Sequence, residues 1–377
     1  MSLLMAASML TVLMSVQPTE EVSAANDYGL ADNIQDGAIL HCFDWKYNDI
    51  KAELQNIAEA GFSAIQTSPA QVGGGSGTWW WLYQPLGFYV GNNDLGTKDE
   101  LKALCAEADT YGIKVVVDVV ANHLAGDHSN IQNDLKDGQY WHNESGGIDY
   151  SNRWQITHRD IGMPDINSEN SYVQQVVKNY LLELKSLGVD GIRWDAAKHI
   201  SLPSESCNFW PTVTEGTGLW HYGEILDDPV ANNPTLAESL IQEYSKYISF
   251  TDSGYCANVR MAFRSNEITS SIGNFSERGV SKDKLVYWAE SHDTYSNDKA
   301  DGNWDSSQFI SQNKIDRAYA VIASQGKASA LYFSRPFETS KNSIKAGVKG
   351  STHFTSPEVA EVNKFKNAMI GQKEYDT

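Results

Sequence analysis

The chain alternates short apolar runs with longer amphipathic segments from about residue 36 to its end. Runs that are apolar on both faces are typical of strands in a parallel sheet. Segments with apolar positions every three or four residues are typical of helices. The pattern predicts strands at residues 38–45, 62–69, 113–123, 189–197, 218–226, 255–263, 284–293 and 328–334. It predicts helices at residues 50–61, 97–112, 171–188, 236–248, 315–326 and 357–369.

Most of the eight predicted strands are followed by a predicted helix. This alternation favours a parallel sheet of the α/β class, and eight strand–helix units favour a closed (β/α)8 TIM barrel. Thr97 and Glu100 are spaced as a capping box, which supports the start of one helix at this point. An open doubly wound sheet is the alternative, although no glycine-rich dinucleotide-binding motif supports it.

The alternation breaks after the third predicted strand. Residues 124–166 are rich in Gly, Asn, Asp and His and contain no long periodic segment. We therefore expect an inserted domain at residues 124–166. The first part of the barrel would take residues 26–123 and the second part residues 167–377.

The N-terminus carries an apolar run from Leu3 to Val16, followed by small residues that end at Ala25. The run is too short to span a bilayer, and the small residues resemble a signal-peptidase site. No Lys or Arg precedes Lys46, so the usual basic region of a signal peptide is missing. We expect a signal peptide at residues 1–25 and a secreted protein, with a non-signal segment as the alternative.

The charge of the chain narrows its possible partners. The chain has 48 acidic and 29 basic residues and a formal net charge of −19. Such a surface repels nucleic acid and anionic lipid, so we expect neither nucleic acid nor a membrane as a partner.

The four cysteines match no zinc motif and are too sparse for a disulfide scaffold. We expect buried thiols, and one disulfide bridge stays possible.

Polar residues gather where the predicted strands end. They are Asp118, Asn122 and His123 towards the end of the third strand, Arg193 and Asp195 towards the end of the fourth with Lys198 and His199 just beyond it, Glu224 near the end of the fifth, and Glu290, His292 and Asp293 at the end of the seventh. In a parallel barrel these ends form one mouth, where active sites lie. Three carboxylates, those of Asp195, Glu224 and Asp293, should therefore converge.

Three converging carboxylates suit the cleavage of a glycosidic bond, which needs a proton donor and a nucleophile. Arg193 lies two residues before Asp195, on the same face of the strand, and would keep Asp195 ionised. Glu224 has aromatic and apolar neighbours that would raise its pKa, which makes it the better acid. A single carboxylate at a strand end is usually a helix cap or a loop ion pair. Three together with flanking Arg and His favour catalysis.

Six segments match one family in order. They are YQPL (83–86), DVVANH (118–123), MPDIN (163–167), GIRWDAAKH (191–199), HYGEIL (221–226) and ESHD (290–293). Together they resemble signature regions of the α-amylase family, glycoside hydrolase family 13, especially its secreted bacterial members. The resemblance implies a (β/α)8 barrel with an inserted domain B after the third strand. It also implies endo-acting hydrolysis of α-1,4-glucans such as starch and glycogen, with retention of anomeric configuration.

The resemblance assigns roles to single residues. It implies Asp195 as nucleophile, Glu224 as acid/base and Asp293 as transition-state stabiliser. Substrate-binding residues would be Tyr83, Gln84, His123, Arg193, Lys198, His199 and His292. It further implies a structural Ca²⁺ ion bound by Asn122, Thr157, Asp165 and the backbone carbonyl of His199, since hard oxygen ligands suit calcium.

Some expectations stay open at this stage. The family usually has a C-terminal β domain after the barrel, whereas this chain ends at Thr377. We expect that domain to be absent, with a fragment of a longer protein as the alternative. We expect a monomer that binds an α-glucan polysaccharide or oligosaccharide. One alternative is a transglycosylase on the same scaffold, which would keep all three carboxylates. A second alternative is an inert sugar-binding relative, although such relatives usually lose a catalytic carboxylate.

Overall fold

The computed structural model describes residues 28–226, 228–266, 279–297 and 306–373. The expected signal peptide at residues 1–25 lies outside the described residues. Within the described residues, no helix combines the length and apolarity needed to cross a bilayer.

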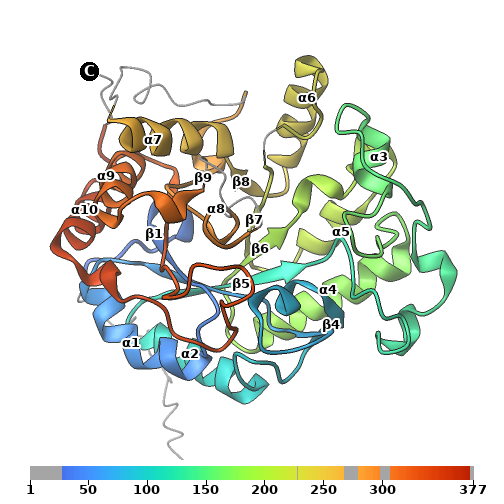
Figure 1. The fold of residues 1–377 in the computed structure, drawn as a ribbon, viewed down its shortest axis with the longest axis horizontal. Coiled ribbons are helices and arrows are strands. Elements are labelled where there is room, and N and C mark those ends of the chain that lie inside the picture. The colour runs from blue at the N-terminus through green and yellow to red at the C-terminus, as the bar shows by residue number, and fades with distance from the viewer. Residues whose placement is uncertain (1–27, 227, 267–278, 298–305, 374–377) are drawn as a thin grey trace, which may run out of the picture.

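Eight parallel strands close into a barrel (Figure 1). They follow one another around it in the order β1 Ala38–Cys42, β2 Ala64–Thr67, β5 Lys114–Val120, β6 Gly191–Asp195, β7 Trp220–Gly223, β8 Ser249–Thr251, β9 Leu285–Trp288 and β10 Ser329–Phe333. All residues of these strands except Lys114 and Trp220 are buried, as expected for a parallel sheet covered by helices. The predicted (β/α)8 barrel is confirmed.

Helices surround the barrel (Figure 1). The longer ones are α1 Tyr47–Glu59, α2 Lys98–Thr110, α4 Ser171–Ser186, α6 Pro234–Tyr244, α7 Ser253–Ser265, α9 Gln312–Ala323 and α10 Pro357–Ala368. Shorter helices are α3 Arg153–His158, α5 Phe209–Thr214 and α8 His292–Ser296. The predicted capping box of α2 is confirmed: the Thr97 side chain accepts from the Glu100 backbone N–H, and the Glu100 side chain accepts from the Thr97 N–H.

The predicted strand at residues 255–263 is wrong. This segment lies inside α7, and the sixth barrel strand is β8, which has only three residues. Tyr255, Cys256 and Val259 are buried because they share one face of a helix, so their spacing fits the helical period better than a strand. Asp252 begins the helix by accepting a hydrogen bond from the Tyr255 backbone N–H at 3.1 Å.

Two segments extend the barrel at its rim. A small antiparallel pair, β3 Gln71–Gly73 and β4 Pro85–Val90, follows β2 and was not predicted from the pattern. Residues 124–166 lie between β5 and α4 and contain α3 as their one α-helix. Isolated bridges pair Trp141 with Ile166 and His123 with Asp165, which ties this segment to the end of β5. The domain limits drawn from the sequence stay a prediction.

The four cysteines lie in the interior. Cys42, Cys105, Cys207 and Cys256 are all buried and free. The expectation of buried thiols is therefore confirmed. The apolar core continues from the barrel interior to the inner faces of the surrounding helices.

Candidate active site

The guanidinium group of Arg193 holds three carboxylates at the end of the barrel. Its Nη1 donates to both carboxylate oxygens of Asp118, each at 2.9 Å, and to Oδ1 of Asp195 at 2.8 Å. Its Nη2 lies 3.1 Å from Oε2 of Glu224. The strand register explains this meeting, because Arg193 on β6 is level with Asp118 on β5 and Tyr222 on β7. The predicted convergence of Asp195 and Glu224 is thereby observed.

The backbone after Asp195 helps to fix Glu224. Ala196 adopts a left-handed conformation with φ of 49°, which is rare for a residue with a Cβ atom. Its N–H donates to Oε2 of Glu224 at 3.0 Å. The N–H of Glu224 in turn donates to the Trp194 carbonyl at 2.9 Å. Strain at Ala196 thus accompanies a hydrogen bond between the two strand ends that carry the carboxylates.

Glu224 lies in an environment that favours its protonated form. Burial raises the pKa of Glu224 above the ordinary glutamate value, while the positive charge of Arg193 opposes the rise and the negative charge of Asp293 adds to it. Asp195 and Glu224 both contact the guanidinium group of Arg193, at 2.8 and 3.1 Å. The environment of Glu224 thus favours the form that a proton donor needs.

Asp293 lies on the first turn of α8, next to this pair. Its Oδ1 accepts from Nδ2 of Asn297 at 3.1 Å, and its Oδ2 lies 3.6 Å from Nε2 of His292. The side chain of Asp293 is 25% exposed, against 12% for Asp195 and Glu224. Asp293 is therefore the most accessible of the three predicted catalytic carboxylates.

Aromatic rings form one wall of the site. The rings of Tyr83 and His292 are stacked with centroids 5.1 Å apart, and Phe43 stacks on the other side of His292 at 5.4 Å. The Tyr83 hydroxyl donates to Oδ2 of Asp118 at 3.0 Å. Burial, with the charge of Arg193, lowers the pKa of His292 to about 4, so this imidazole is neutral at pH 7.

His123 carries an unused polar atom. Its Nε2 contacts the carbonyl oxygen of Tyr83 at 2.9 Å. Its Nδ1 is buried and has no hydrogen-bond partner among the described residues. Because buried polar atoms are normally paired, this nitrogen is suited to a ligand that is not present here.

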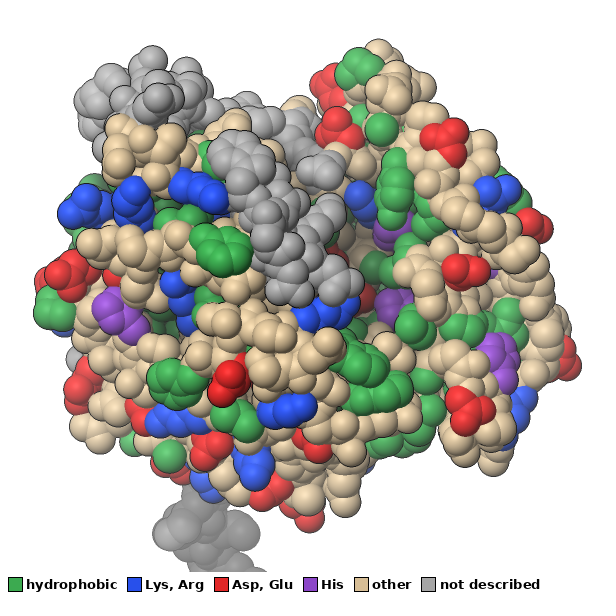
Figure 2. Space-filling model, viewed as in Figure 1, with side chains coloured by type: hydrophobic (Ala, Val, Ile, Leu, Met, Phe, Trp, Pro, Cys, Tyr) green, Lys and Arg blue, Asp and Glu red, His purple; other side chains and the backbone are tan. Residues whose placement is uncertain are grey.

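A pocket lies among these groups. Its lining includes Arg193, Glu224 and His292, together with His41 from β1 and Gln66 from β2. Figure 2 shows the molecule hollowed between the barrel and the lobe that carries α3, with histidine side chains visible in the hollow.

The other predicted substrate-binding residues lie outside this cluster. The Lys198 ammonium group donates to the carbonyl of Leu226, two residues after Glu224, and therefore lies at the rim. Nδ1 of His199 contacts the Ile156 carbonyl at 2.8 Å. The Gln84 side chain shares no hydrogen bond with the cluster within the described part of the chain. The structure brings Lys198 near the site and leaves Gln84 and the His199 ring apart from it.

Two of the predicted calcium ligands lie together. Asn122 Nδ2 donates to Oδ1 of Asp165 at 2.9 Å, and the bond between the His199 ring and Ile156 places His199 beside Thr157. Amide, carboxylate and carbonyl oxygens are the donors that calcium prefers, so this set fits the ion. Burial raises the pKa of Asp165 to about 7, even with His142 paired to it, and a bound cation would keep Asp165 ionised. The Thr157 hydroxyl lies 3.3 Å from the carbonyls of Arg153 and Trp154 in its own helix.

Sequence reasoning missed part of the site. His41 lies in the barrel interior, against His292 at a centroid distance of 5.6 Å, and the alternation of β1 was the only signal for it. Glu290, grouped from sequence with the polar mouth, is buried in a two-point ion pair with Arg335 at 2.7 and 2.8 Å. Glu290 thus supports the loop that carries His292 and does not face the pocket.

The sequence is similar to that of known proteins of one family. The sequence model described as "Alpha amylase, catalytic domain" matches residues 48–314. An alpha-amylase from Clostridium acetobutylicum is 35% identical over 367 residues, with 92% of this chain and 45% of the relative covered. An alpha-amylase from Butyrivibrio fibrisolvens is 32% identical, with 96% of this chain and 42% of the relative covered. The chain thus spans less than half the length of these two relatives.

Solved structures share the fold. An alpha-amylase I variant from Eisenia fetida, in complex with maltohexaose, aligns with a TM-score of 0.74 at 20% identity and covers 91% of this chain and 78% of its own. An alpha-amylase from Geobacillus thermoleovorans, in complex with acarbose, aligns with a TM-score of 0.66 at 20% identity and covers 89% and 79%. At this level of identity the likeness establishes the fold alone.

Proposed function

The chain belongs to the alpha-amylase family, and from that premise we propose that it is a retaining, endo-acting glycoside hydrolase that cleaves α-1,4-glucosidic bonds in starch, glycogen and related α-glucans. One observation carries the proposal: Asp195 and Glu224 contact the same guanidinium group, at 2.8 and 3.1 Å. Two carboxyl groups on one guanidinium can flank a single glycosidic bond, as retaining glycosidases require.

Glu224 donates the proton in the first step. Its raised pKa keeps a share of it protonated when Asp195 is ionised. The proton passes to the glycosidic oxygen as the bond between that oxygen and the anomeric carbon breaks. The Asp195 carboxylate forms a bond to the anomeric carbon, which gives a covalent glycosyl-enzyme.

Water completes the reaction. Glu224, now ionised, takes a proton from a water molecule whose oxygen attacks the anomeric carbon, and the bond to Asp195 breaks. Two displacements at one carbon return the α configuration. Asp293, the more exposed carboxylate, would bind sugar hydroxyls and stabilise the positive charge that develops on the ring.

The remaining residues bind and orient the sugar. The stacked rings of Tyr83 and His292 offer an apolar face to one sugar ring. The unpaired Nδ1 of His123 is placed to hydrogen bond a sugar hydroxyl. Lys198, at the rim, would contact the leaving-group side.

Calcium belongs to the proposal as a structural ion. Asn122, Thr157, Asp165 and the His199 carbonyl would hold it. When bound, the ion supplies a fixed positive charge that ties residues 124–166 to the barrel. It takes no part in the proton transfers described above.

The acid role of Glu224 can be tested with two substrates. Glu224→Gln should lower the rate of starch hydrolysis by about 100-fold or more, because general acid catalysis contributes about 10²–10⁴-fold. The same variant should lose much less on α-maltosyl fluoride, whose leaving group needs no protonation. Glu215→Gln, at an exposed residue outside the Arg193 cluster, serves as the matched control.

Three outcomes of this test would count against the proposal. Equal starch clearing by wild type and Glu224→Gln would remove the acid assignment. Equal losses on both substrates would mean that Glu224 acts by some route other than proton donation. Products longer than the substrate, formed from maltoheptaose by the wild type, would replace hydrolysis with transglycosylation.

Secretion is a further part of the proposal. The apolar run that ends near Val16 and the small residues up to Ala25 support it. Protein recovered from the culture medium of an expressing bacterium should begin near residue 26 when its N-terminus is sequenced. Protein retained in the cells with an intact Met1 would contradict secretion.

A further inference from the structure

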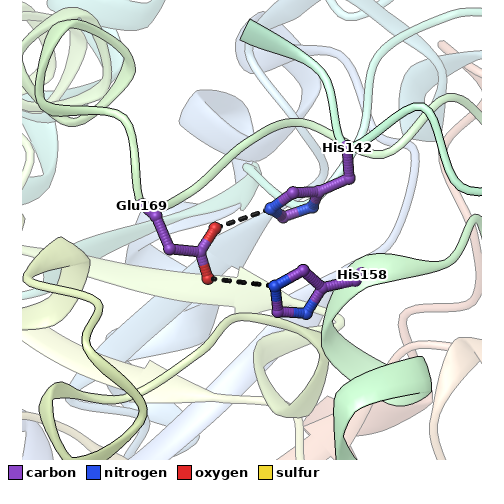
Figure 3. Close-up of side chains that lie close together, drawn as sticks. All are labelled: His142, His158 and Glu169. Carbon is purple, nitrogen blue, oxygen red and sulfur yellow. Dashed lines mark hydrogen bonds and ion pairs between the residues drawn. The ribbon is translucent and has the colours of Figure 1, made fainter. Parts of the chain in front are cut away.

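A second cluster of ligand-type side chains lies in the inserted segment, apart from Arg193 and its carboxylates. His142 comes from a loop, His158 is the last residue of α3, and Glu169 precedes α4. Nε2 of His142 lies 2.6 Å from Oε2 of Glu169, and Nε2 of His158 lies 3.9 Å from Oε1 of the same carboxylate. One ligand atom from each of the three residues lies within 4.8 Å of the others. Figure 3 shows both imidazole rings directed at the Glu169 carboxylate.

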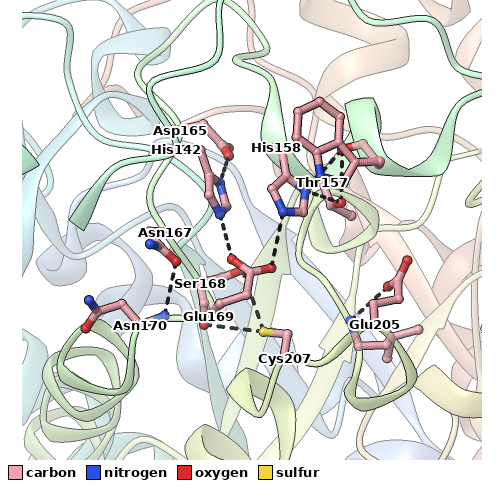
Figure 4. Close-up of polar contacts among 12 residues, drawn as sticks. His142, Thr157, His158, Asp165, Asn167, Ser168, Glu169, Asn170, Glu205 and Cys207 are labelled. Atoms are coloured by element: carbon pink, nitrogen blue, oxygen red, sulfur yellow. Dashed lines mark hydrogen bonds and ion pairs between the residues drawn. The ribbon is translucent and has the colours of Figure 1, made fainter. Parts of the chain in front are cut away.

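The outer nitrogens of both imidazoles are already occupied. Nδ1 of His142 contacts Oδ2 of Asp165 at 2.6 Å (Figure 4). Nδ1 of His158 contacts the Trp154 carbonyl at 3.1 Å. An acceptor at one ring nitrogen fixes the tautomer and leaves the other nitrogen as a ligand. Both histidines thus have the arrangement of metal-binding histidines, with Nε2 turned towards a common space.

Hydrogen bonding within the cluster is incomplete. The link from Asp165 through His142 to Glu169 accounts for one oxygen of Glu169. The other oxygen, Oε1, is buried and forms no hydrogen bond of ordinary length among the described residues, although the buried Ser201 hydroxyl is near enough to interact with this carboxylate. The 3.9 Å between Oε1 and Nε2 of His158 is too long for a hydrogen bond. The ion pair between His142 and the two carboxylates therefore leaves Nε2 of His158 facing Glu169 without a hydrogen bond to it.

Packing holds His158 in this position. Its ring is stacked on Trp154, with centroids 4.8 Å apart and an interplanar angle of 20°. The rings of His142 and His158 lie 4.5 Å apart. Both rings therefore border the same space in front of the Glu169 carboxylate.

We propose that His142, His158 and Glu169 bind a divalent transition-metal ion, with Zn²⁺ as the expected ion. Two imidazole nitrogens and one carboxylate favour zinc over calcium, which prefers oxygen ligands alone. Water would complete the coordination, and the Nε2 proton of His142 would be released to solvent on binding. The ion would join α3 and the loop at His142 to the start of α4. This site goes beyond the proposed hydrolysis and does not depend on it.

The test separates zinc from calcium. Metal-depleted protein is saturated with Ca²⁺, and Co²⁺ is then titrated as a visible-absorption probe, followed by displacement with Zn²⁺. We expect one Co²⁺ per chain with ligand-field bands of nitrogen and oxygen coordination, displaced by one equivalent of Zn²⁺. In His158→Ala and in Glu169→Gln the affinity for Zn²⁺ should fall at least tenfold.

Controls keep the result specific. His128→Ala removes an exposed histidine of the same segment and should bind Zn²⁺ as the wild type does. Zn²⁺ should also raise the melting temperature of Ca²⁺-saturated wild type but not of Glu169→Gln, whose side chain keeps the size of glutamate. Far-UV circular dichroism checks that each variant is folded.

Two results would overturn the proposal. One is the absence of stoichiometric Zn²⁺ or Co²⁺ binding to the Ca²⁺-saturated wild type. The other is binding that survives unchanged in folded His158→Ala and Glu169→Gln. Starch hydrolysis by these variants reports separately on the proposed function, since neither residue lies in the catalytic cluster.

Discussion

Arg193 determines how the carboxylates of the candidate active site meet. One guanidinium group, 4% exposed as a residue, contacts Asp118, Asp195 and Glu224 at once. A planar group with five fixed donors can do this, whereas an ammonium group is a point charge with no such geometry. The charge of Arg193 is therefore only part of its role.

Arg193→Lys tests this claim at the residue scale. We predict a loss of about 100-fold or more in kcat, comparable to removing one preorganised donor from an active site. Arg159→Lys, at a partly exposed position in the inserted segment, should leave kcat unchanged. Steady-state kinetics on maltoheptaose, with circular dichroism to verify folding, make the comparison. Wild-type kcat in a folded Arg193→Lys protein would contradict the role given to the guanidinium geometry.

In the proposed mechanism, the pH dependence of hydrolysis follows from Glu224. The reaction needs the protonated form, so kcat/KM falls as pH rises through the raised pKa of this group. The negative charge of Asp293 contributes to that rise. We predict that Asp293→Asn, besides lowering the rate, moves the alkaline limb of its residual pH profile to lower pH. A limb that stays in place or moves to higher pH would show that Asp293 does not act on Glu224.

The position of a single side chain was predictable where the strand pattern shows which face of the strand it lies on. Arg193 and Asp195 lie two apart on one strand, so their shared face was readable from the sequence. The left-handed backbone at Ala196 and its hydrogen bond to Glu224 could not be predicted from the sequence, because no glycine or asparagine marks that position. The partner of Glu290, Arg335, lies 45 residues away, and only the closed barrel brings the two together.

At the scale of elements, pattern reading failed where a strand was short. β8 has three residues, Ser-Phe-Thr, and too few positions to show any period. The apolar residues after it are spaced for a helix, and the prediction of a strand at residues 255–263 was therefore wrong. The β3–β4 pair was missed for the same reason, as β3 also has three residues. The longer elements, such as α4 and β5, carried enough positions to be predicted.

The ion pair between Glu290 and Arg335 links two barrel strands. Glu290 follows β9 and Arg335 follows β10, and Arg335 also donates to the carbonyls of Ser307 and Ile310 at 3.0 Å. Because the pair is buried, removing one charge leaves the other unpaired. We predict that Glu290→Gln lowers the free energy of unfolding by about 3–5 kcal/mol.

A matched variant at an exposed ion pair shows whether burial causes the predicted loss of stability in Glu290→Gln. Glu361→Gln breaks an exposed pair with Lys364 and should change the free energy by about 0.5 kcal/mol or less. Denaturant unfolding of both variants gives the comparison. Equal changes in the free energy of unfolding would mean that the buried pair of Glu290 and Arg335 stabilises the fold no more than a surface pair does.

At the scale of the whole molecule, calcium should couple the inserted segment to the barrel. The Asn122–Asp165 contact joins the end of β5 to the end of residues 124–166. Chelation should lower the melting temperature, and added Ca²⁺ should restore it, because an ion bound only by the folded state stabilises that state. Mg²⁺, which demands stricter geometry, should restore it less. An unchanged melting curve after chelation would remove calcium from the account.

The overall architecture was the most predictable feature of this chain. Eight strand–helix units are repeated over more than 300 residues. The barrel was therefore predicted correctly even though one of its strands was placed in the wrong segment. The insertion was visible only as a break in that rhythm. Its contacts, including those of His142 and His158, depend on loops whose path no local pattern encodes.

The stereochemistry of the product tests the central claim most directly. Asp195 and Glu224 on one guanidinium predict two displacements at the anomeric carbon and therefore retention. In a proton NMR time course on maltoheptaose, the α-anomer of the new reducing end should appear first, with the β-anomer growing later by mutarotation. A β-anomer that appears first would mean inversion, and Asp195 could then not be the nucleophile.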